Sequence, residues 1–136
     1  MFVYVAGAID LDVSKKPWRK LVYAAMKTGY TIFDPCTAFV VRDSVGSASA
    51  KWIEEINTLA LSKADWFICY ISKHVSSVGT PIELNMAHKA GKAIILITDI
   101  QPFHKSVYLA NRVLPERVID ATLPDIEIVN KLASMI

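Results

Sequence analysis

The chain has 136 residues, of which 53% are hydrophobic and 21% are charged, so it fits one domain with a buried core and a disordered chain is excluded. Its net charge is +2 without a cluster of Lys and Arg, which argues against a surface for polymeric nucleic acid. The apolar N-terminal run is far shorter than a membrane span and lacks a basic leader, so we expect a single domain over residues 1–136 in the cytoplasm, with no membrane partner.

The first part of the chain begins with an apolar, β-rich run at residues 2–6, which Gly7 ends and which predicts a buried first strand. One apolar face at helical spacing predicts a helix over 14–27. A second strand is predicted over 30–33. The serine-rich stretch 34–49 that follows predicts a long loop over the ligand-binding face.

The rest of the chain continues the alternation of helices and strands. A helix is predicted over 50–61, with Trp52, Ile56, Leu59 and Ala60 on its buried side. The remaining predicted elements are strand 66–71, helix 81–90, strand 93–98, helix 105–114, strand 117–119 and helix 123–135. We therefore predict an α/β fold with a doubly wound, five-stranded parallel sheet, a flavodoxin-like three-layer sandwich.

The predicted helix 81–90 carries a carboxylate, Glu83, in its first turn. This turn follows a strand, so it lies at the carboxyl edge of the sheet, where ligands bind in folds of this class. Thr80 and Glu83, with Pro81 at the first helical position, also fit a capping box that only stabilises the helix N-terminus. On these residues alone, a structural and a catalytic role for Glu83 both stay open.

Several short motifs resemble the nucleoside 2-deoxyribosyltransferase family over about residues 2–98. They are Tyr4-Val5-Ala6-Gly7, Ala64-Asp65 and Gly79-x-x-x-Glu83-Leu84-x-x-Ala87-x-x-x-Gly91-Lys92. The resemblance implies that Glu83 is the catalytic nucleophile that attacks the anomeric carbon, and that Tyr4 orients its carboxylate. Such a carboxylate stores the sugar as a covalent ester while the base is replaced. A purely structural role of Tyr4 in the core stays open as well.

Asn57 stands where the family usually has an aspartate that helps to protonate the leaving base. An amide cannot supply a proton as an acid does. Asn57 is still a candidate catalytic residue, and three alternatives stay open. Either Asn57 only hydrogen-bonds the base, or another acid such as Glu54, Asp34 or Asp10 reaches the site, or the activity is weak.

Ser77 is a second departure from the family pattern. Transferases that act on free nucleosides tend to have an aspartate here that holds the 5′-hydroxyl. A serine donates to a phosphate without repelling it, and in this respect the chain resembles the branch of 2′-deoxynucleoside 5′-monophosphate N-glycosidases. The loop after the first strand, Gly7-Ala8-Ile9-Asp10, lacks the Ser and Arg of that branch.

The position of the carboxyl edge and the family resemblance together predict the substrate-binding residues. They are Gly7, Ile9, Asp10, Asp34, Ser77, Gly79 and Asn111. Asn111 lies in the region that, in family members, completes the site of a neighbouring subunit, so the resemblance implies a homodimer or a higher homo-oligomer. Asp65 precedes the third strand and is expected to be structural. We predict no metal, because no His or Cys has metal-ligand spacing, and no cofactor, because the first loop lacks a phosphate cradle for FMN.

The sequence thus leads to three hypotheses about function. The first is an enzyme that cleaves the N-glycosidic bond of 2′-deoxynucleosides through a glutamyl-sugar intermediate and transfers the sugar to another base. The second is a 2′-deoxynucleoside 5′-monophosphate N-glycosidase, a hydrolase. The third is a catalytically weak protein that binds nucleotides. The expected partner is in each case a small nucleoside or nucleotide.

Overall fold

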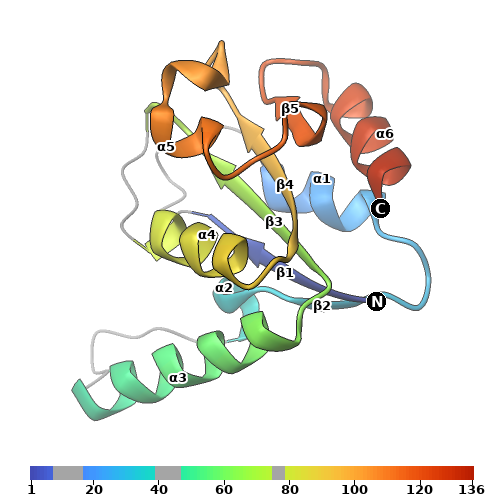
Figure 1. The fold of residues 1–136 in the computed structure, drawn as a ribbon. Coiled ribbons are helices and arrows are strands. Elements are labelled where there is room, and N and C mark those ends of the chain that lie inside the picture. The colour runs from blue at the N-terminus through green and yellow to red at the C-terminus, as the bar shows by residue number, and fades with distance from the viewer. Residues whose placement is uncertain (8–16, 39–46, 75–78) are drawn as a thin grey trace.

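The fold is built around one parallel sheet. The computed structural model describes residues 1–7, 17–38, 47–74 and 79–136. Within these ranges the strands are β1 (Phe2–Ala6), β2 (Thr31–Phe33), β3 (Trp66–Ile71), β4 (Ala93–Thr98) and β5 (Val118–Asp120). They form a five-stranded sheet in the order β2-β1-β3-β4-β5, and every neighbouring pair is parallel (Figure 1). The strand order reverses between β1 and β3, and parallel sheets of this kind bind ligands at that point.

Helices cover both faces of the sheet. Among the described residues they are α1 (Trp18–Ala25), α2 (Pro35–Ala38), α3 (Ser47–Lys63), α4 (Gly79–Lys89), α5 (Val107–Ala110) and α6 (Asp125–Met135), with short 3-10 turns at Phe103–Lys105 and Pro115–Arg117. The buried side chains of α1 and α6 belong to one core cluster, and those of α3, α4 and α5 to another. The predicted doubly wound, three-layer α/β fold is therefore confirmed.

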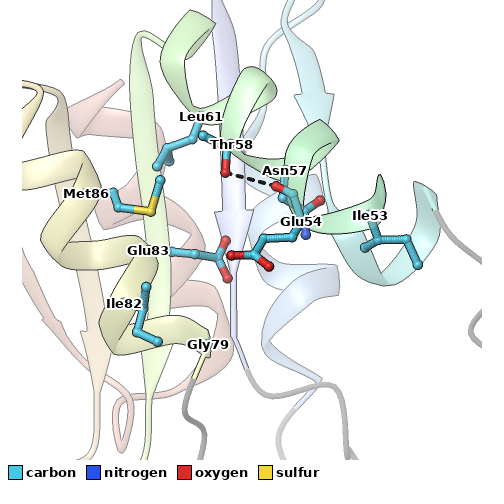
Figure 2. Close-up of a pocket in the computed structure, with 9 residues that line it drawn as sticks. All are labelled: Ile53, Glu54, Asn57, Thr58, Leu61, Gly79, Ile82, Glu83 and Met86. Carbon is cyan, nitrogen blue, oxygen red and sulfur yellow. Dashed lines mark hydrogen bonds between the residues drawn. The ribbon is translucent and has the colours of Figure 1, made fainter. Parts of the chain in front are cut away.

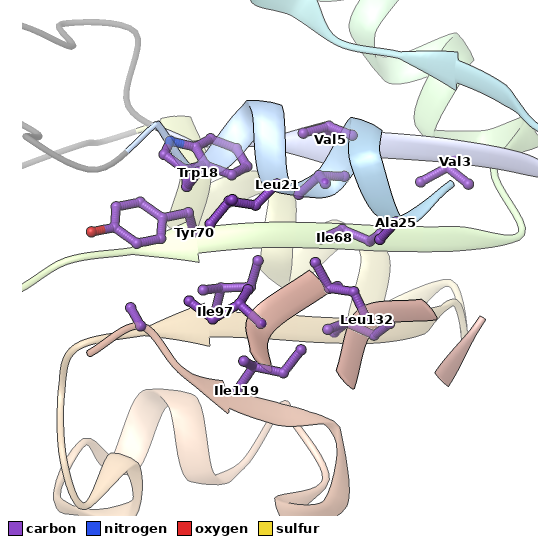
Figure 3. Packing of buried hydrophobic residues seen from close by; sticks show 14 residues of the cluster. Val3, Val5, Trp18, Leu21, Ala25, Ile68, Tyr70, Ile97, Ile119 and Leu132 are labelled. Carbon is purple, nitrogen blue, oxygen red and sulfur yellow. The ribbon is translucent and has the colours of Figure 1, made fainter. Parts of the chain in front are cut away.

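The first core lies between the sheet and the pair α1 and α6 (Figure 3). Strand residues that point to this face, such as Val5 and Ile68, are fully buried. Trp18 opens α1 and stacks on Tyr70 of β3, with ring centroids 5.3 Å apart. Large apolar side chains of this kind each contribute about 1.5–3 kcal/mol on burial, so this layer anchors the strands that carry the site.

The second core lies under α3, α4 and α5, and it includes Tyr4 of β1. Successive side chains of a strand alternate between faces, so Tyr4 points away from α1 and toward α3 and α4. Its ring lies 5.4 Å from the ring of Phe33 and 5.7 Å from that of Phe67. These contacts hold a phenol on the face of the sheet that carries α4.

Gly7 follows β1 where the backbone passes Trp18. A Cβ atom at Gly7 would lie 2.2 Å from Cζ2 of the Trp18 ring, a distance that the buried indole cannot accommodate. We predict that Gly7→Ala lowers the free energy of unfolding by about 1–3 kcal/mol, as overpacked core substitutions do. Urea unfolding followed by tryptophan fluorescence measures this. Gly79→Ala is the matched control, because a Cβ there meets nothing closer than 3.6 Å.

Asp65 ties the start of β1 to the start of β3. Its backbone N–H donates to the Phe2 carbonyl at 2.8 Å, and its Oδ2 accepts from the Phe2 N–H at 2.8 Å. This pair lies at the amino edge of the sheet, so the predicted structural role of Asp65 is confirmed.

Several predicted boundaries were wrong. The stretch 34–49 is not all loop, because α2 occupies part of it and α3 begins at Ser47 instead of residue 50. The predicted helix 105–114 is one short helix, α5, flanked by turns. The described part of the predicted helix 14–27 is helical only over Trp18–Ala25. Sequence patterns locate the limits of an element only to within about 2–4 residues.

The predicted buried side of α3 was also wrong in part. Trp52 and Leu59 are each 57% exposed, whereas Ala60 is buried as predicted and Leu61 is buried beside it. Figure 1 shows the reason: the C-terminal part of α3 meets the rest of the fold, while its first turns extend away from the sheet. Among the described residues no helix is both long and apolar enough to cross a membrane.

Candidate active site

A cavity of about 290 Å³ lies between α3 and α4 (Figure 2). It is lined by Ile53, Glu54, Asn57, Thr58, Leu61, Gly79, Ile82, Glu83 and Met86. Its volume is close to the lower end of the range of small-molecule sites, which are mostly apolar with a few converging polar groups. The mixture of four aliphatic or thioether side chains with two carboxylates and an amide fits that description.

Glu83 lies on the second turn of α4, and its carboxylate points into this cavity (Figure 2). Its Oε2 atom is buried and has no hydrogen-bond partner among the described residues. The Oε1 atom of the same carboxylate lies beside Gly79 at the start of α4, so Glu83 reaches both the helix N-terminus and the cavity. Gly79 lines the same wall, and a Cβ there would lie 3.6 Å from Glu83 Oε1. The absence of a side chain at Gly79 keeps the approach to the carboxylate open.

Tyr4 supplies the phenol that the sequence predicted beside this carboxylate. Its side chain is fully buried, and its hydroxyl makes no hydrogen bond of ordinary geometry within the described residues. Burial, followed by the negative charge of Glu83, raises the pKa of Tyr4 far above its usual value. The phenol therefore keeps its proton at neutral pH and can only donate it to an acceptor. Burial raises the pKa of Glu83, and the Tyr4 hydroxyl offsets part of that rise, as expected for a donor that faces a carboxylate.

Burial is the largest influence on Glu83 and raises its pKa, while the Tyr4 hydroxyl and the positive charge of Arg19 partly offset it. A carboxyl whose pKa is higher in the folded state stabilises folding at acidic pH, and this contribution is lost as the pH rises through the raised pKa. We therefore predict that Glu83→Gln raises Tm at neutral pH by several degrees. The gain should shrink as the pH falls through the raised pKa of Glu83 and should vanish below the usual carboxyl range. Thermal unfolding at several pH values checks this, and an equal Tm difference at every pH would contradict it.

Asn57 lies on α3 and lines the cavity opposite Glu83. Its Oδ1 atom is buried and has no hydrogen-bond partner among the described residues. A buried amide oxygen without a partner costs about 1–3 kcal/mol, and a ligand with a donor group would offset that cost. Glu54, one helical turn earlier, also lines the cavity, and its carbonyl accepts a hydrogen bond from Thr58 Oγ1 at 2.9 Å (Figure 2).

Asp34 has different partners from those the sequence predicted. Only 2% of this residue is exposed, and its Oδ2 accepts from Arg19 Nε at 2.9 Å and from the Tyr23 hydroxyl at 2.7 Å. Its Oδ1 accepts from the Cys36 N–H at 2.9 Å. Asp34 does not line the cavity. These contacts give Asp34 the role of joining the end of β2 to α1.

Of the other predicted site residues that the structure describes, only Gly79 lines the cavity. Gly7 packs against Trp18, and its carbonyl accepts from Arg19 Nη2 at 3.2 Å. Asn111 is exposed at the end of α5 and does not line the cavity. Ile9, Asp10 and Ser77 lie outside the described residues. No group of three or more His, Cys, Asp or Glu side chains suited to hold a metal occurs in the described part of the chain.

The apolar lining of the cavity was not predicted from the sequence. Ile53, Asn57 and Leu61 recur at intervals of four residues on α3, and Ile82 and Met86 do the same on α4. Residues four apart share one face of a helix. This spacing was a usable signal, although it does not show which two helix faces meet.

The α5 segment holds α4 in place through contacts with its first two turns. The Tyr108 hydroxyl donates to the Pro81 carbonyl in the first turn of α4. Arg112 Nε donates to Asn85 Oδ1 at 3.2 Å, and its guanidinium lies 3.8 Å from the centre of the Tyr108 ring. These contacts bracket Glu83 in sequence, so they hold the segment of α4 that carries its carboxylate.

Solved structures with this fold include enzymes that act on nucleosides and nucleotides. A 2-deoxyribosyltransferase from Bacillus psychrosaccharolyticus has a TM-score of 0.69 at 14% identity, over 94% of this chain and 96% of that one. The CMP N-glycosidase BcmB of Clostridium botulinum has a TM-score of 0.62 at 22% identity, over 97% of this chain and 98% of that one. A 2-desoxiribosyltransferase from Leishmania mexicana has a TM-score of 0.53 at 18% identity, over 73% of this chain and 65% of that one.

The chain shares its fold with these 2-deoxyribosyltransferases and with the N-glycosidase. No protein-family model and no curated protein matches the sequence. The fold that the sequence resemblance implied is thus confirmed by structural similarity, at identities of 14–22%. Fold alone does not fix an activity, so function has to be argued from the cavity.

Proposed function

We propose that the protein cleaves the N-glycosidic bond of 2′-deoxynucleosides and transfers the sugar to another base, with Glu83 as nucleophile. The observation that carries this proposal is the Glu83 carboxylate, which points into the cavity with a buried Oε2 atom that has no hydrogen-bond partner among the described residues. A structural carboxylate is normally satisfied by protein donors when buried. A carboxylate left unsatisfied at a cavity wall is suited to attack an electrophilic carbon.

The chemistry divides into two displacements at the anomeric carbon. In the first, a carboxylate oxygen of Glu83 forms a bond to C1′ while the C1′–N bond breaks and its electron pair goes to the base. In the second, an acceptor base attacks C1′ and releases Glu83. Both pass through an oxocarbenium-like state, which is easier to reach in a 2′-deoxy sugar because no electron-withdrawing 2′-hydroxyl is present. In this reaction the Tyr4 hydroxyl, which also lacks a partner of ordinary geometry among the described residues, turns to donate its proton to the carboxylate and orients it for the attack.

The walls of the cavity suit a flat heterocycle. Ile53, Ile82 and Met86 provide apolar surface, and Asn57 offers both donors and an acceptor to the edge of a base. A homodimer or higher homo-oligomer that shares the site, with Asn111 facing a neighbouring subunit, is part of the same proposal. Ile9, Asp10 and Ser77 would then complete the sugar and 5′ end of the site.

Hydrolysis of a nucleoside 5′-monophosphate is the second candidate function. The observation that favours it is the structural similarity to a CMP N-glycosidase over nearly the full length of both chains. In this version water replaces the acceptor base in the second displacement, and Ser77 contacts the phosphate. The third hypothesis is nucleotide binding without turnover. It follows from Asn57, because an amide at this position cannot protonate the leaving base.

One assay distinguishes the three functions. The protein is incubated with a 2′-deoxynucleoside or its 5′-monophosphate, with and without a second free base, and the products are separated by chromatography. A new nucleoside that forms only with the second base indicates transfer, whereas free sugar without exchange indicates hydrolysis. A rise in Tm with the ligand, combined with no product, would refute both enzymatic proposals and support binding alone.

A further inference from the structure

The cavity contains a second carboxylate that faces Glu83. Glu54 and Asn57 lie three residues apart on α3, so they share one face of that helix. Figure 2 shows the Glu54 carboxylate extending from α3 toward the Glu83 carboxylate on α4. Two carboxylates on opposite walls of one cavity are the arrangement that glycosidic bond cleavage uses, one as nucleophile and one as acid.

The departure of a base from C1′ leaves an electron pair on a ring nitrogen, and a proton donor stabilises it. Asn57 can hydrogen-bond a base but cannot give up a proton as an acid. Of the other acids that the sequence left open, Asp34 accepts hydrogen bonds from Arg19, Tyr23 and Cys36 and lies outside the cavity. Within the described residues, the carboxylates that line the cavity are those of Glu54 and Glu83.

We propose that Glu54 is the proton donor to the leaving base, a role that rests on the proposed cleavage of the N-glycosidic bond. Glu54 transfers a proton to a ring nitrogen as the C1′–N bond breaks and Glu83 bonds to C1′. It is left as a carboxylate. In the second displacement the attacking base or water loses a proton to Glu54, which restores the acid and frees Glu83. Asn57 hydrogen-bonds the base and positions its ring nitrogen next to the Glu54 carboxyl group.

Two substrates, compared on the same Glu54 variant, distinguish the loss of a proton donor from a defect in folding, because a folding defect would slow the cleavage of both. An ordinary 2′-deoxynucleoside needs a proton on its leaving base. A 7-methylated 2′-deoxyguanosine carries a fixed positive charge on its base, which leaves as a neutral molecule and needs no acid. We expect Glu54→Gln to lower kcat on the ordinary substrate by about 10²–10⁴-fold and to leave kcat on the methylated substrate unchanged.

Two further variants complete the experiment. Glu55→Gln is the matched control, because Glu55 is exposed on the same helix and does not line the cavity; it should behave as wild type on both substrates. Asn57→Asp added to Glu54→Gln restores an acid one turn away, and it should recover part of the lost rate on the ordinary substrate. Tm of each variant shows whether it is folded.

The outcomes separate the two proposals. If wild type cleaves both substrates and Glu54→Gln slows neither, or slows both equally, the role of Glu54 is refuted while the cleavage activity stands. If wild type cleaves neither substrate, the proposed function itself is refuted. Selective loss on the ordinary substrate, with recovery by Asn57→Asp, supports Glu54 as the acid.

Discussion

Replacing Glu83 by Gln is expected to lower kcat for cleavage of 2′-deoxynucleosides by about 10³-fold or more, the scale of loss seen when a covalent nucleophile is removed. The amide is close in size to the carboxylate, so the cavity keeps its shape. It lacks the negative charge that attacks C1′ and stabilises the oxocarbenium-like state. The substrate should still bind, because the cavity walls on α3 and α4 are unchanged. The rate of base release, measured under saturating substrate, reports the effect.

His88→Gln is the control for this variant. His88 is exposed on the same helix and does not line the cavity, so its replacement should leave kcat near the wild-type value. Circular dichroism should show that both variants are folded. A Glu83→Gln protein that keeps wild-type kcat would refute the assignment of the nucleophile.

Replacing Asp34 by Ala is expected to lower the free energy of unfolding by about 3–5 kcal/mol, the cost of removing one partner of a buried ion pair. The side chain of Arg19, which is 11% exposed, would lose its ion-pair partner. The Tyr23 hydroxyl and the Cys36 N–H would lose their acceptor as well. Domains of this kind have a total stability of about 5–15 kcal/mol, so the variant should unfold at much lower urea concentration.

A double variant gives the control for Asp34. Arg19→Met combined with Asp34→Leu removes both charges together, and apolar replacements of a buried ion pair are often neutral. The double variant should therefore be more stable than Asp34→Ala alone. If the free energy of unfolding of Asp34→Ala is within about 1 kcal/mol of the wild-type value, the ion pair does not have the structural role assigned to it.

Much of the sheet could be predicted because its strands are apolar on both faces. Residues 66–71 and 93–98 form unbroken apolar runs, and the structure places β3 and β4 at these limits. A parallel strand buried on both sides requires such a run. The position of Glu83 at the carboxyl edge followed from the same strand and helix pattern.

The fate of Asp34 could not be predicted, because it depends on a partner in another element. Asp34 follows a strand at the carboxyl edge and has the pattern of a ligand-binding acid. The packing of α1 brings Arg19 and Tyr23 to it. The residues around Asp34 in the sequence do not predict that α1 packs against it. Tertiary contacts determine whether a carboxylate at the carboxyl edge of the sheet forms an ion pair or faces a ligand site.

The cavity itself was only partly predictable. Glu83 and Asn57 came from the family resemblance, whereas the part played by Ile53 and Ile82 depends on how α3 lies against α4. The exposed Trp52 shows the same difficulty, because an apolar residue at helical spacing is buried only where a neighbouring element covers it.

The most direct test of the central claim is the mass of the protein after reaction with a 2′-deoxynucleoside that carries fluorine at C2′. Fluorine destabilises the oxocarbenium-like state, so the second displacement is slow and the sugar ester accumulates. If Glu83 is the nucleophile, we expect the intact mass of the protein to increase by the mass of one sugar. Peptide mapping should locate this adduct on the peptide that contains Glu83, and the Glu83→Gln protein should not form it. Release of free base with no adduct, or an adduct on a peptide without Glu83, would contradict it.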